Sequence, residues 1–75
     1  MTKEDSLSLI INGKKRVFAA NDFPPTLLSL IEYLNMEVAT IVAEVDGEIA
    51  DRGRFSEVTL SSGMTVELIR FVGGG

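Results

Sequence analysis

Polar and apolar residues alternate near the start of the chain, and this alternation predicts a β-hairpin. Residues 6–11 form the first expected strand, and residues 14–19 return as the second. Between them, Asn12-Gly13 is the pair best suited to a two-residue turn in which both residues take a positive φ. One face of the first strand carries the apolar residues Leu7, Leu9 and Ile11.

Helical spacing of apolar residues begins after a loop that contains two prolines. These residues recur at i, i+3, i+4 and i+7, the stripe of an amphipathic helix, and are Leu27, Leu30, Ile31 and Leu34. We expect the helix to begin at Thr26 or Leu27 and to end at about Asn35, which can serve as its C-terminal stop. Because the helix is short, packing against a sheet must stabilise it more than intrinsic propensity does.

The rest of the chain is expected to form short strands joined by turns. The expected strands cover residues 41–45, 48–50, 58–60 and 65–72. Asp46-Gly47 is a second two-residue turn, and the charged, irregular stretch 51–57 is anchored in the core by Phe55. This order of elements indicates an α+β fold, in which a small mixed β-sheet packs on one main helix. At this length, residues 1–75 make a single domain.

Two residue types are missing from the composition, and their absence limits the kinds of catalytic and metal-binding site that the chain can form. The chain has no cysteine and no histidine, which excludes disulfides, thiolate zinc sites, cysteine nucleophiles and the commonest general base. We therefore expect no metal site, no bound cofactor and no independent enzymatic activity.

Charge and hydropathy bear on the partners and on the location of the protein. The net charge is −4 and the basic residues form no long run, which argues against binding to nucleic acid. No apolar stretch approaches the roughly 20 residues that span a bilayer. The polar residues 1–5 lack the hydrophobic segment of a secretory signal. We expect a cytoplasmic protein that binds neither nucleic acid nor a membrane.

The phase of the last strand predicts an exposed apolar patch. If Val66 and Leu68 face the helix, Ile69 and Phe71 point to the opposite face, which so short a chain has nothing left to cover. Phe18 joins them if the residue before it points inward. Contiguous exposed apolar residues mark partner surfaces, although a bulge near the strand end would instead bury Phe71. The expected partner-binding residues are Ile69, Phe71, Val72 and Phe18.

The chain ends on Gly73-Gly74-Gly75, directly after the last expected strand. Glycine has no side chain to pack and is costly to order, so we expect a flexible tail that contributes nothing to the core. Three glycines span at most about 10 Å and can thread a narrow channel. The free carboxylate of Gly75 is a poor acyl donor, because its leaving group is hydroxide or oxide. It must therefore first be activated, typically as a mixed anhydride with AMP. A frayed end or a cloning remnant is the alternative, but no other linker or tag residue separates the glycines from the strand.

The run of residues 66–75, which reads Val-Glu-Leu-Ile-Arg-Phe-Val-Gly-Gly-Gly, resembles the C-terminal run of the ubiquitin-like sulfur carriers. The resemblance is closest to the carrier of thiazole formation in thiamine biosynthesis. Residues 11–13, 42–47 and 54–63 support it, so that it covers nearly the whole chain. It implies a β-grasp fold, also called the ubiquitin-like fold, and a carrier protein that enzymes act on.

The resemblance also implies a cycle of reactions at the C-terminal carboxylate. An adenylating, E1-like enzyme would convert the carboxylate of Gly75 to an acyl-adenylate, using ATP and magnesium. A persulfide-bearing donor, such as a cysteine desulfurase, would displace AMP and leave a thiocarboxylate on Gly75. Thiazole synthase would then accept the sulfur.

Three alternatives stay open at this stage. The small subunit of molybdopterin synthase shares the fold and the Gly-Gly end, but its members usually carry a proline-containing run before the glycines, which Phe71-Val72-Gly73 does not match. A ubiquitin-like protein modifier would share the chemistry as far as the adenylate, and only its acceptor differs. A plain interaction module, in which the glycines are incidental, would keep its function when Gly75 is removed.

Overall fold

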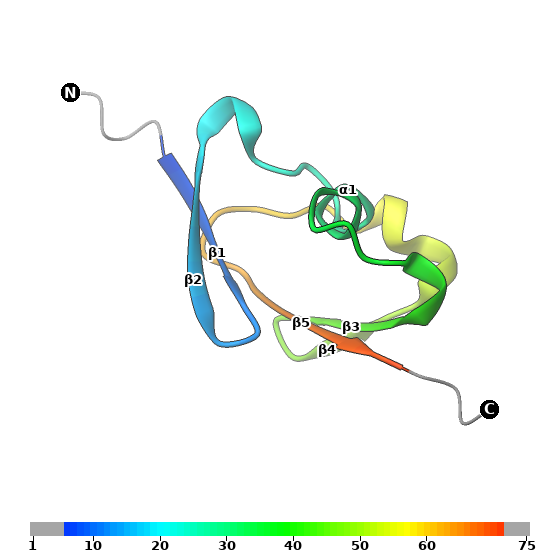
Figure 1. Ribbon diagram of the computed structural model, residues 1–75. Helices are drawn as coiled ribbons and strands as arrows, with labels where there is room; N and C mark the ends of the chain where they lie inside the picture. Colours follow the sequence, from blue (N-terminus) through cyan, green and yellow to red (C-terminus); the bar gives the residue numbers. More distant parts are fainter. Residues whose placement is uncertain (1–5, 72–75) are drawn as a thin grey trace.

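The computed structural model of the chain describes residues 6–71 (Figure 1). The strands are β1 (Ser6–Ile11), β2 (Lys14–Ala19), β3 (Ile41–Val45), β4 (Glu48–Ala50) and β5 (Thr65–Arg70). The helices are α1 (Leu27–Tyr33) and the short 3₁₀ helices η2 (Ala20–Asp22), η3 (Val38–Thr40) and η4 (Arg52–Glu57). The hairpin at the start, the expected α-helix, and the later strands at residues 41–45, 48–50 and from Thr65 onward are confirmed.

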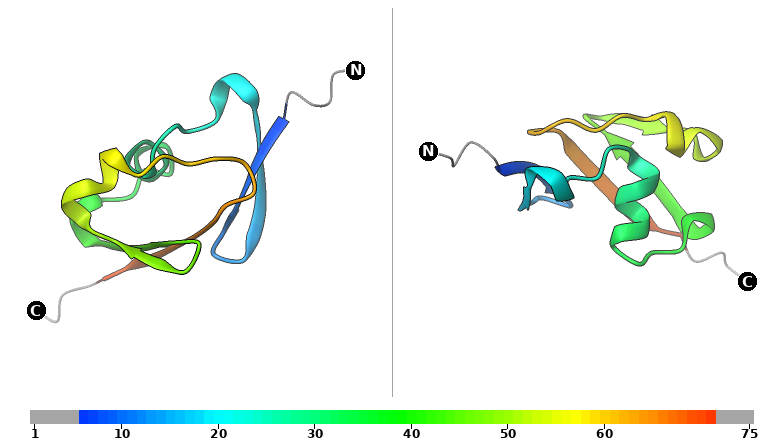
Figure 2. Two further views of the ribbon diagram at one scale, coloured as in Figure 1. Left: turned by 180° about the vertical axis from the view of Figure 1, so that it is seen from behind. Right: turned by 90° about the horizontal axis from the view of Figure 1, so that it is seen from above.

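The five strands form one mixed sheet in the order β2-β1-β5-β3-β4. The last strand, β5, lies in the middle, parallel to β1 and antiparallel to β3. The sheet curves around α1, which lies on one side of it, and Figure 2 shows the same arrangement from behind and from above. The expected architecture, a small mixed sheet packed on one main helix, is therefore confirmed. Within residues 6–71, no helix covers the opposite side of the sheet.

The core lies between α1 and the inner face of the sheet. Its largest fully buried side chains are Leu9, Leu27, Leu30, Ile31, Ile41, Phe55 and Val66. Three of the four residues of the predicted helical stripe are among them, and the fourth, Leu34, packs at the edge. Phe55, the predicted anchor of the segment after β4, is also in this set, and that segment forms 3₁₀ turns interrupted by a kink at Arg54 where an irregular chain is predicted. Burial of each such side chain contributes about 1.5–3 kcal/mol.

The two predicted hairpin turns are present, and both use left-handed backbone conformations. Asn12 and Asp46 have φ values of 50° and 52°, and the glycines that follow them have 83° and 87°. This is the pattern of the two-residue turn that matches the twist of a hairpin. Asn35, the predicted stop of the helix, also has a positive φ of 59°, which supports its role as the residue that ends α1.

Both turns also hold the central strand β5 with hydrogen bonds. The side-chain Oδ1 of Asn12 accepts a bond of 2.7 Å from the backbone N–H of Leu68, and its Nδ2 donates one of 3.2 Å to the carbonyl of the same residue. On the other side of β5, the Asp46 Oδ1 accepts a bond of 2.9 Å from the N–H of Thr65. The Asp46 N–H donates one of 2.8 Å to the Thr65 carbonyl. These bonds extend the hydrogen bonding of β5 past the last residue of β1 and the last residue of β3.

Three boundaries differ from the prediction. α1 ends at Tyr33, because the chain passes through Leu34 into the left-handed residue Asn35, and its first turn is capped by Thr26. Residues 58–60 make no strand, since only Thr59 forms a bridge, with Thr26. β5 ends at Arg70, although Phe71 still donates its N–H to the Thr40 carbonyl, and Val72 lies outside the described residues.

Candidate functional site

β5 carries the chain toward the C-terminal tail predicted to react. Val72 and the three glycines Gly73, Gly74 and Gly75 lie outside the described residues, so their proposed roles stay predictions. The structure does place the residues immediately before them. The site is therefore built from β5, from the strands beside it and from Phe71.

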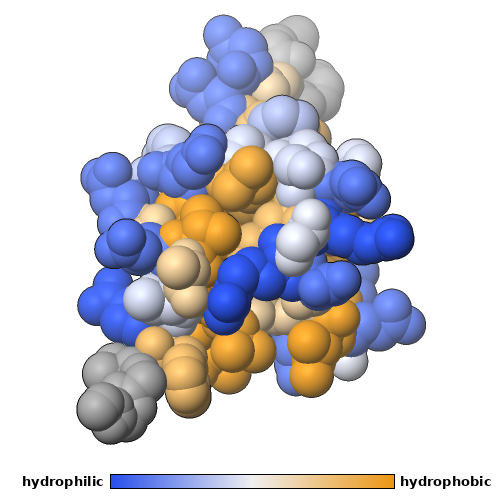
Figure 3. All heavy atoms as spheres, turned by 90° about the vertical axis from the view of Figure 1, so that its right-hand side faces the viewer, coloured by the Kyte–Doolittle hydropathy of each residue, from blue (hydrophilic) through white to orange (hydrophobic). Residues whose placement is uncertain are grey.

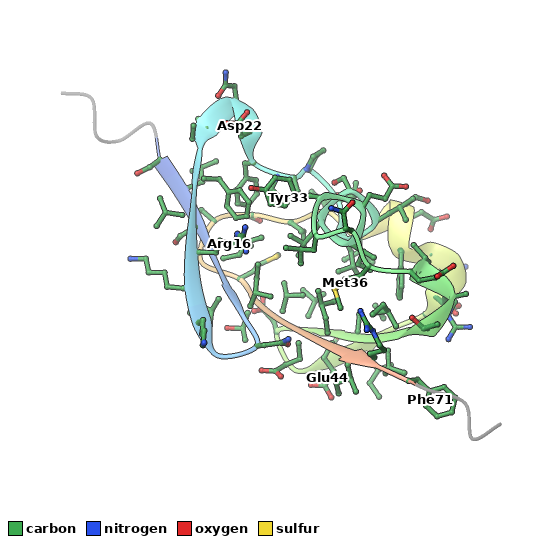
Figure 4. The ribbon with its side chains drawn as sticks, viewed as in Figure 1. Arg16, Asp22, Tyr33, Met36, Glu44 and Phe71 are labelled. Atoms are coloured by element: carbon green, nitrogen blue, oxygen red, sulfur yellow. The ribbon has the colours of Figure 1, made fainter. Side chains whose placement is uncertain are left out.

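The inward and outward positions of β5 follow the predicted phase. Val66 and Leu68 are buried against the core. Ile69 is 54% exposed and Phe71 is 58% exposed, so the bulge that would have buried Phe71 does not occur. Figure 4 shows the ring of Phe71 at the C-terminal end of β5, away from α1. The predicted exposure of both residues is confirmed, whereas their binding to a partner stays a prediction.

Phe18 does not belong to this surface, and the expectation that it lies there is wrong. It is only 4% exposed, and its ring packs edge-on against Phe23 and Tyr33 at centroid distances of 5.7 and 5.6 Å. The register explains the difference, because Phe18 pairs with Leu7 on the inner face of the hairpin. Val17 is the outward residue instead, with 61% of its surface exposed.

The structure adds aliphatic residues that sequence reasoning did not include. Val42 on β3 lies directly opposite Ile69, and Ile49 on β4 pairs with Glu44, the next outward residue of β3. Ile49 is the most exposed large apolar residue described, at 72%. Ile10 on β1 is also exposed on this side of the sheet, but it pairs with Thr65, at the other end of β5 from Ile69. Alternation along residues 41–45 hints that Val42 points outward, but the register that brings these residues together cannot be read locally.

We call this surface the open face, defined by Ile10, Val42, Ile49, Ile69 and Phe71. It is the outer side of the sheet, opposite the side that α1 covers (Figure 1). In Figure 3, which keeps the same vertical direction, hydrophobic side chains reach the surface along the lower edge of the molecule, where that side of the sheet lies. Exposed apolar side chains that gather on one face of a protein mark interaction sites.

The end of β5 also borders a more polar hollow on the inner side of the sheet. Its lining includes Arg70 from β5, Met36 after α1, and the acidic residues Glu32 and Glu37. Met36 lies between the helix and the sheet in Figure 4. Within residues 6–71 no cluster of acidic, histidine or cysteine side chains has the composition of a metal site. Among the helices described, none has the length and apolarity needed to cross a membrane.

Comparison with known proteins gives three findings. The model of the ThiS family matches residues 9–75. A crystal structure of the thiamine biosynthesis protein ThiS from Geobacter metallireducens has a TM-score of 0.77 and 27% identity, and covers 92% of this chain and all of that one. A thiazole synthase of Paramagnetospirillum magneticum is 29% identical over 69 residues, which are 92% of this chain. The chain spans only about a fifth, 20%, of the length of that relative.

The fold and the comparisons agree. The mixed sheet with one covering helix matches the β-grasp architecture of the ThiS structure, at an identity high enough to carry more than the fold. The family model covers nearly all of the chain, including the three terminal glycines. The chain therefore belongs to the ThiS family.

Proposed function

We propose that this protein carries sulfur on the C-terminal carboxylate of Gly75 and delivers it for thiazole formation. The observation that carries the proposal is the Gly73-Gly74-Gly75 end, which comes two residues, Phe71 and Val72, after the central strand of a ThiS-family domain. A tail without side chains can enter a narrow active site of another protein. The domain then serves to hold and aim the tail, and the enzymes that act on it supply the catalytic groups.

The chemistry begins with activation of the carboxylate. One carboxylate oxygen of Gly75 attacks the α-phosphate of ATP, pyrophosphate leaves, and an acyl-adenylate forms. The adenylating, E1-like partner supplies the site for ATP and for the magnesium ion that neutralises its phosphates. The ATP and the magnesium belong to that partner's site.

Sulfur then replaces the adenylate in two steps. The terminal sulfur of a persulfide on a donor protein, such as a cysteine desulfurase, attacks the acyl carbon, and AMP leaves. The resulting acyl disulfide is cleaved by a second thiol, which takes the donor's sulfur into a disulfide and leaves a thiocarboxylate on Gly75. Because the sulfur is held on the main-chain terminus, the carrier requires no cysteine of its own, and it has none.

Thiazole synthase is the proposed acceptor of this sulfur. Support comes from the relative that bears this name, which aligns with our chain over a fifth of its own length. That alignment fits a polypeptide in which a carrier domain like this one is joined to the synthase. We propose a cytoplasmic location for the cycle, because the predicted enzymes of this pathway need ATP.

The experiment that tests the proposal is reconstitution from purified proteins. The carrier is incubated with an adenylating enzyme from the same organism, ATP, magnesium, a cysteine desulfurase and cysteine, and the product is measured by intact mass spectrometry. We expect a mass increase that matches replacement of one oxygen by sulfur at Gly75. The variant without Gly75 keeps its thermal unfolding midpoint but gains no sulfur.

Other outcomes would overturn the proposal. A variant that lacks Gly75 and still accepts sulfur would show that the glycine carboxylate is not the carrier group. Conjugates linked to lysines of other proteins, with no thiocarboxylate intermediate, would identify a protein modifier. A thiocarboxylate that is delivered to a molybdopterin precursor, and not to thiazole synthase, would leave the carrier chemistry intact and change the pathway.

A further inference from the structure

Two carboxylates lie opposite each other in the middle of the open face. Glu44 on β3 and Glu67 on β5 are direct partners in the antiparallel register. Both point to the outer side of the sheet, because the residues next to them in each strand, such as Ala43 and Leu68, are buried in the core. Figure 4 shows Glu44 on the side of the sheet away from α1. Each of the two glutamates is half-buried.

Within the described part of the chain, neither carboxylate has a cationic partner. The ion pair found there joins Arg54 and Glu57, at 3.6 Å. Lys15, which has the outward phase of β2, is separated from β5 by the whole of β1. Arg70 pairs with the inward-facing Ile41, so its side chain lies in the hollow on the other side of the sheet.

This arrangement costs stability in the free protein. Like charges placed directly opposite on neighbouring strands are destabilising. One side of the pair is apolar, because Val42 and Ile69 form the next outward pair and Ile49 lies across from Glu44. On the other side, the outward neighbour of Glu67 is Thr65, whose backbone is bonded to Asp46. Two unpaired carboxylates beside an apolar surface are complementary to a protein surface that presents a cation next to apolar groups. A second copy of this chain does not fit, because a two-fold contact through this face would bring four carboxylates together.

We propose that the adenylating partner inserts an arginine side chain between Glu44 and Glu67 when it binds the open face. The inference rests on the function proposed above and identifies the chemistry of its docking step. Arginine suits the site better than lysine, because its planar guanidinium has five donors and can bond to both carboxylates at once. Aliphatic side chains around that arginine pack on Ile49 and Ile69, which excludes water and strengthens the charge interaction.

The test uses Glu67→Gln and Glu44→Gln, which remove one charge each and keep the shape of the side chain. Adenylation is followed by pyrophosphate exchange, and unfolding by thermal denaturation. We expect each variant to raise the KM for the carrier roughly tenfold with little change in kcat. The same variants should unfold at a temperature about 1–4 °C higher, because the repulsion is removed. Opposite effects on binding and on stability are not expected of a purely structural pair.

Glu32→Gln is the matched control. Glu32 is an exposed glutamate on α1, on the other side of the sheet, so its replacement removes the same charge without touching the open face. The KM for the Glu32→Gln carrier should stay within twofold of the KM for the wild-type carrier, which is about the limit expected for an exposed charge outside the contact. Added salt should raise the KM of wild type and raise that of Glu67→Gln less, since one charge of the contact is gone.

The outcomes separate this inference from the function on which it rests. If wild type is adenylated and the Glu67→Gln and Glu44→Gln variants keep its KM, the arginine contact is wrong and the proposed function stands. A higher KM that comes with a lower unfolding temperature also rejects the inference, because it shows that the pair supports the fold. If wild type is not adenylated by the enzyme at all, the proposed function fails, and this inference fails with it.

Discussion

At the scale of single residues, the separation between core and open face is sharp along β5. Val66 and Leu68 are buried while Ile69, one position further, is more than half exposed. The same alternation places Phe18 in the core and Val17 outside it. The hydrophobic character of a residue therefore does not reveal its role here, since the phase of its strand decides it. Two aromatic residues show this, because Phe18 on β2 is buried whereas Phe71, which follows β5, is more than half exposed.

Phe71→Ala tests that difference. Because more than half of the ring is in contact with solvent, we expect the free energy of unfolding to fall by less than about 1 kcal/mol. The KM for the carrier in the adenylation reaction should rise, because the open face loses its largest apolar group.

Phe55→Ala is the comparison for Phe71→Ala. Phe55 is one of the fully buried side chains, so its truncation should cost about 3–5 kcal/mol, or unfold the protein. The milder Phe55→Leu keeps the comparison measurable if the alanine variant does not fold. A stability loss for Phe71→Ala as large as that for Phe55, together with unchanged adenylation, would place Phe71 in the structural core.

At the scale of elements, the central position of β5 depends on the turns of the two hairpins. Asn12 ends β1 and Asp46 ends β3, and each bonds to the backbone of β5. The sequence predicts both turns, because Asn-Gly and Asp-Gly are the residue pairs that such turns require. It does not predict these bonds, since the partners Leu68 and Thr65 are distant in the chain. The same limit applies to the open face, whose pairs depend on register, and to residues 58–60, where a strand was expected and a single bridge occurs.

Asn12→Gly isolates the contribution of the Asn12 side chain to the attachment of the turn to β5. Glycine keeps the positive φ of the turn without strain, so the main loss is the pair of hydrogen bonds to Leu68. We expect the free energy of unfolding in urea to fall by about 1–3 kcal/mol, because a backbone N–H and carbonyl lose their partner.

Asn35→Gly provides the matched control for that experiment. Asn35 has nearly the same backbone conformation at the end of α1, but its side chain has no hydrogen bond in the described structure. Its replacement should change stability by no more than about 0.5 kcal/mol. If both variants lose the same free energy of unfolding, the effect is due to the added freedom of glycine in the unfolded chain. The hydrogen bonds from Asn12 to Leu68 would then not be needed to explain it.

At the scale of the whole molecule, the two sides of the sheet differ in their surroundings. One side packs on α1 and supplies the stability of the domain, while the other keeps its apolar residues in solvent. β5 has residues on both sides and lies at the centre of the sheet, and Phe71 and Val72 separate it in the sequence from the terminal glycines. This division suits the proposed carrier, because β5 is paired on both sides and the open face is available to the proposed adenylating enzyme. The ThiS-family match makes sulfur the cargo that this account proposes.

Intact mass spectrometry of the protein purified from its own cells tests this claim most directly. The account predicts a fraction of molecules whose mass is higher by the difference between sulfur and oxygen, with fragmentation placing the change at Gly75. The fraction should disappear in cells that lack the adenylating enzyme and in a variant without Gly75. If the protein carries only an unmodified carboxylate while the thiamine pathway is active, or if the added sulfur maps to another residue, the central claim is contradicted.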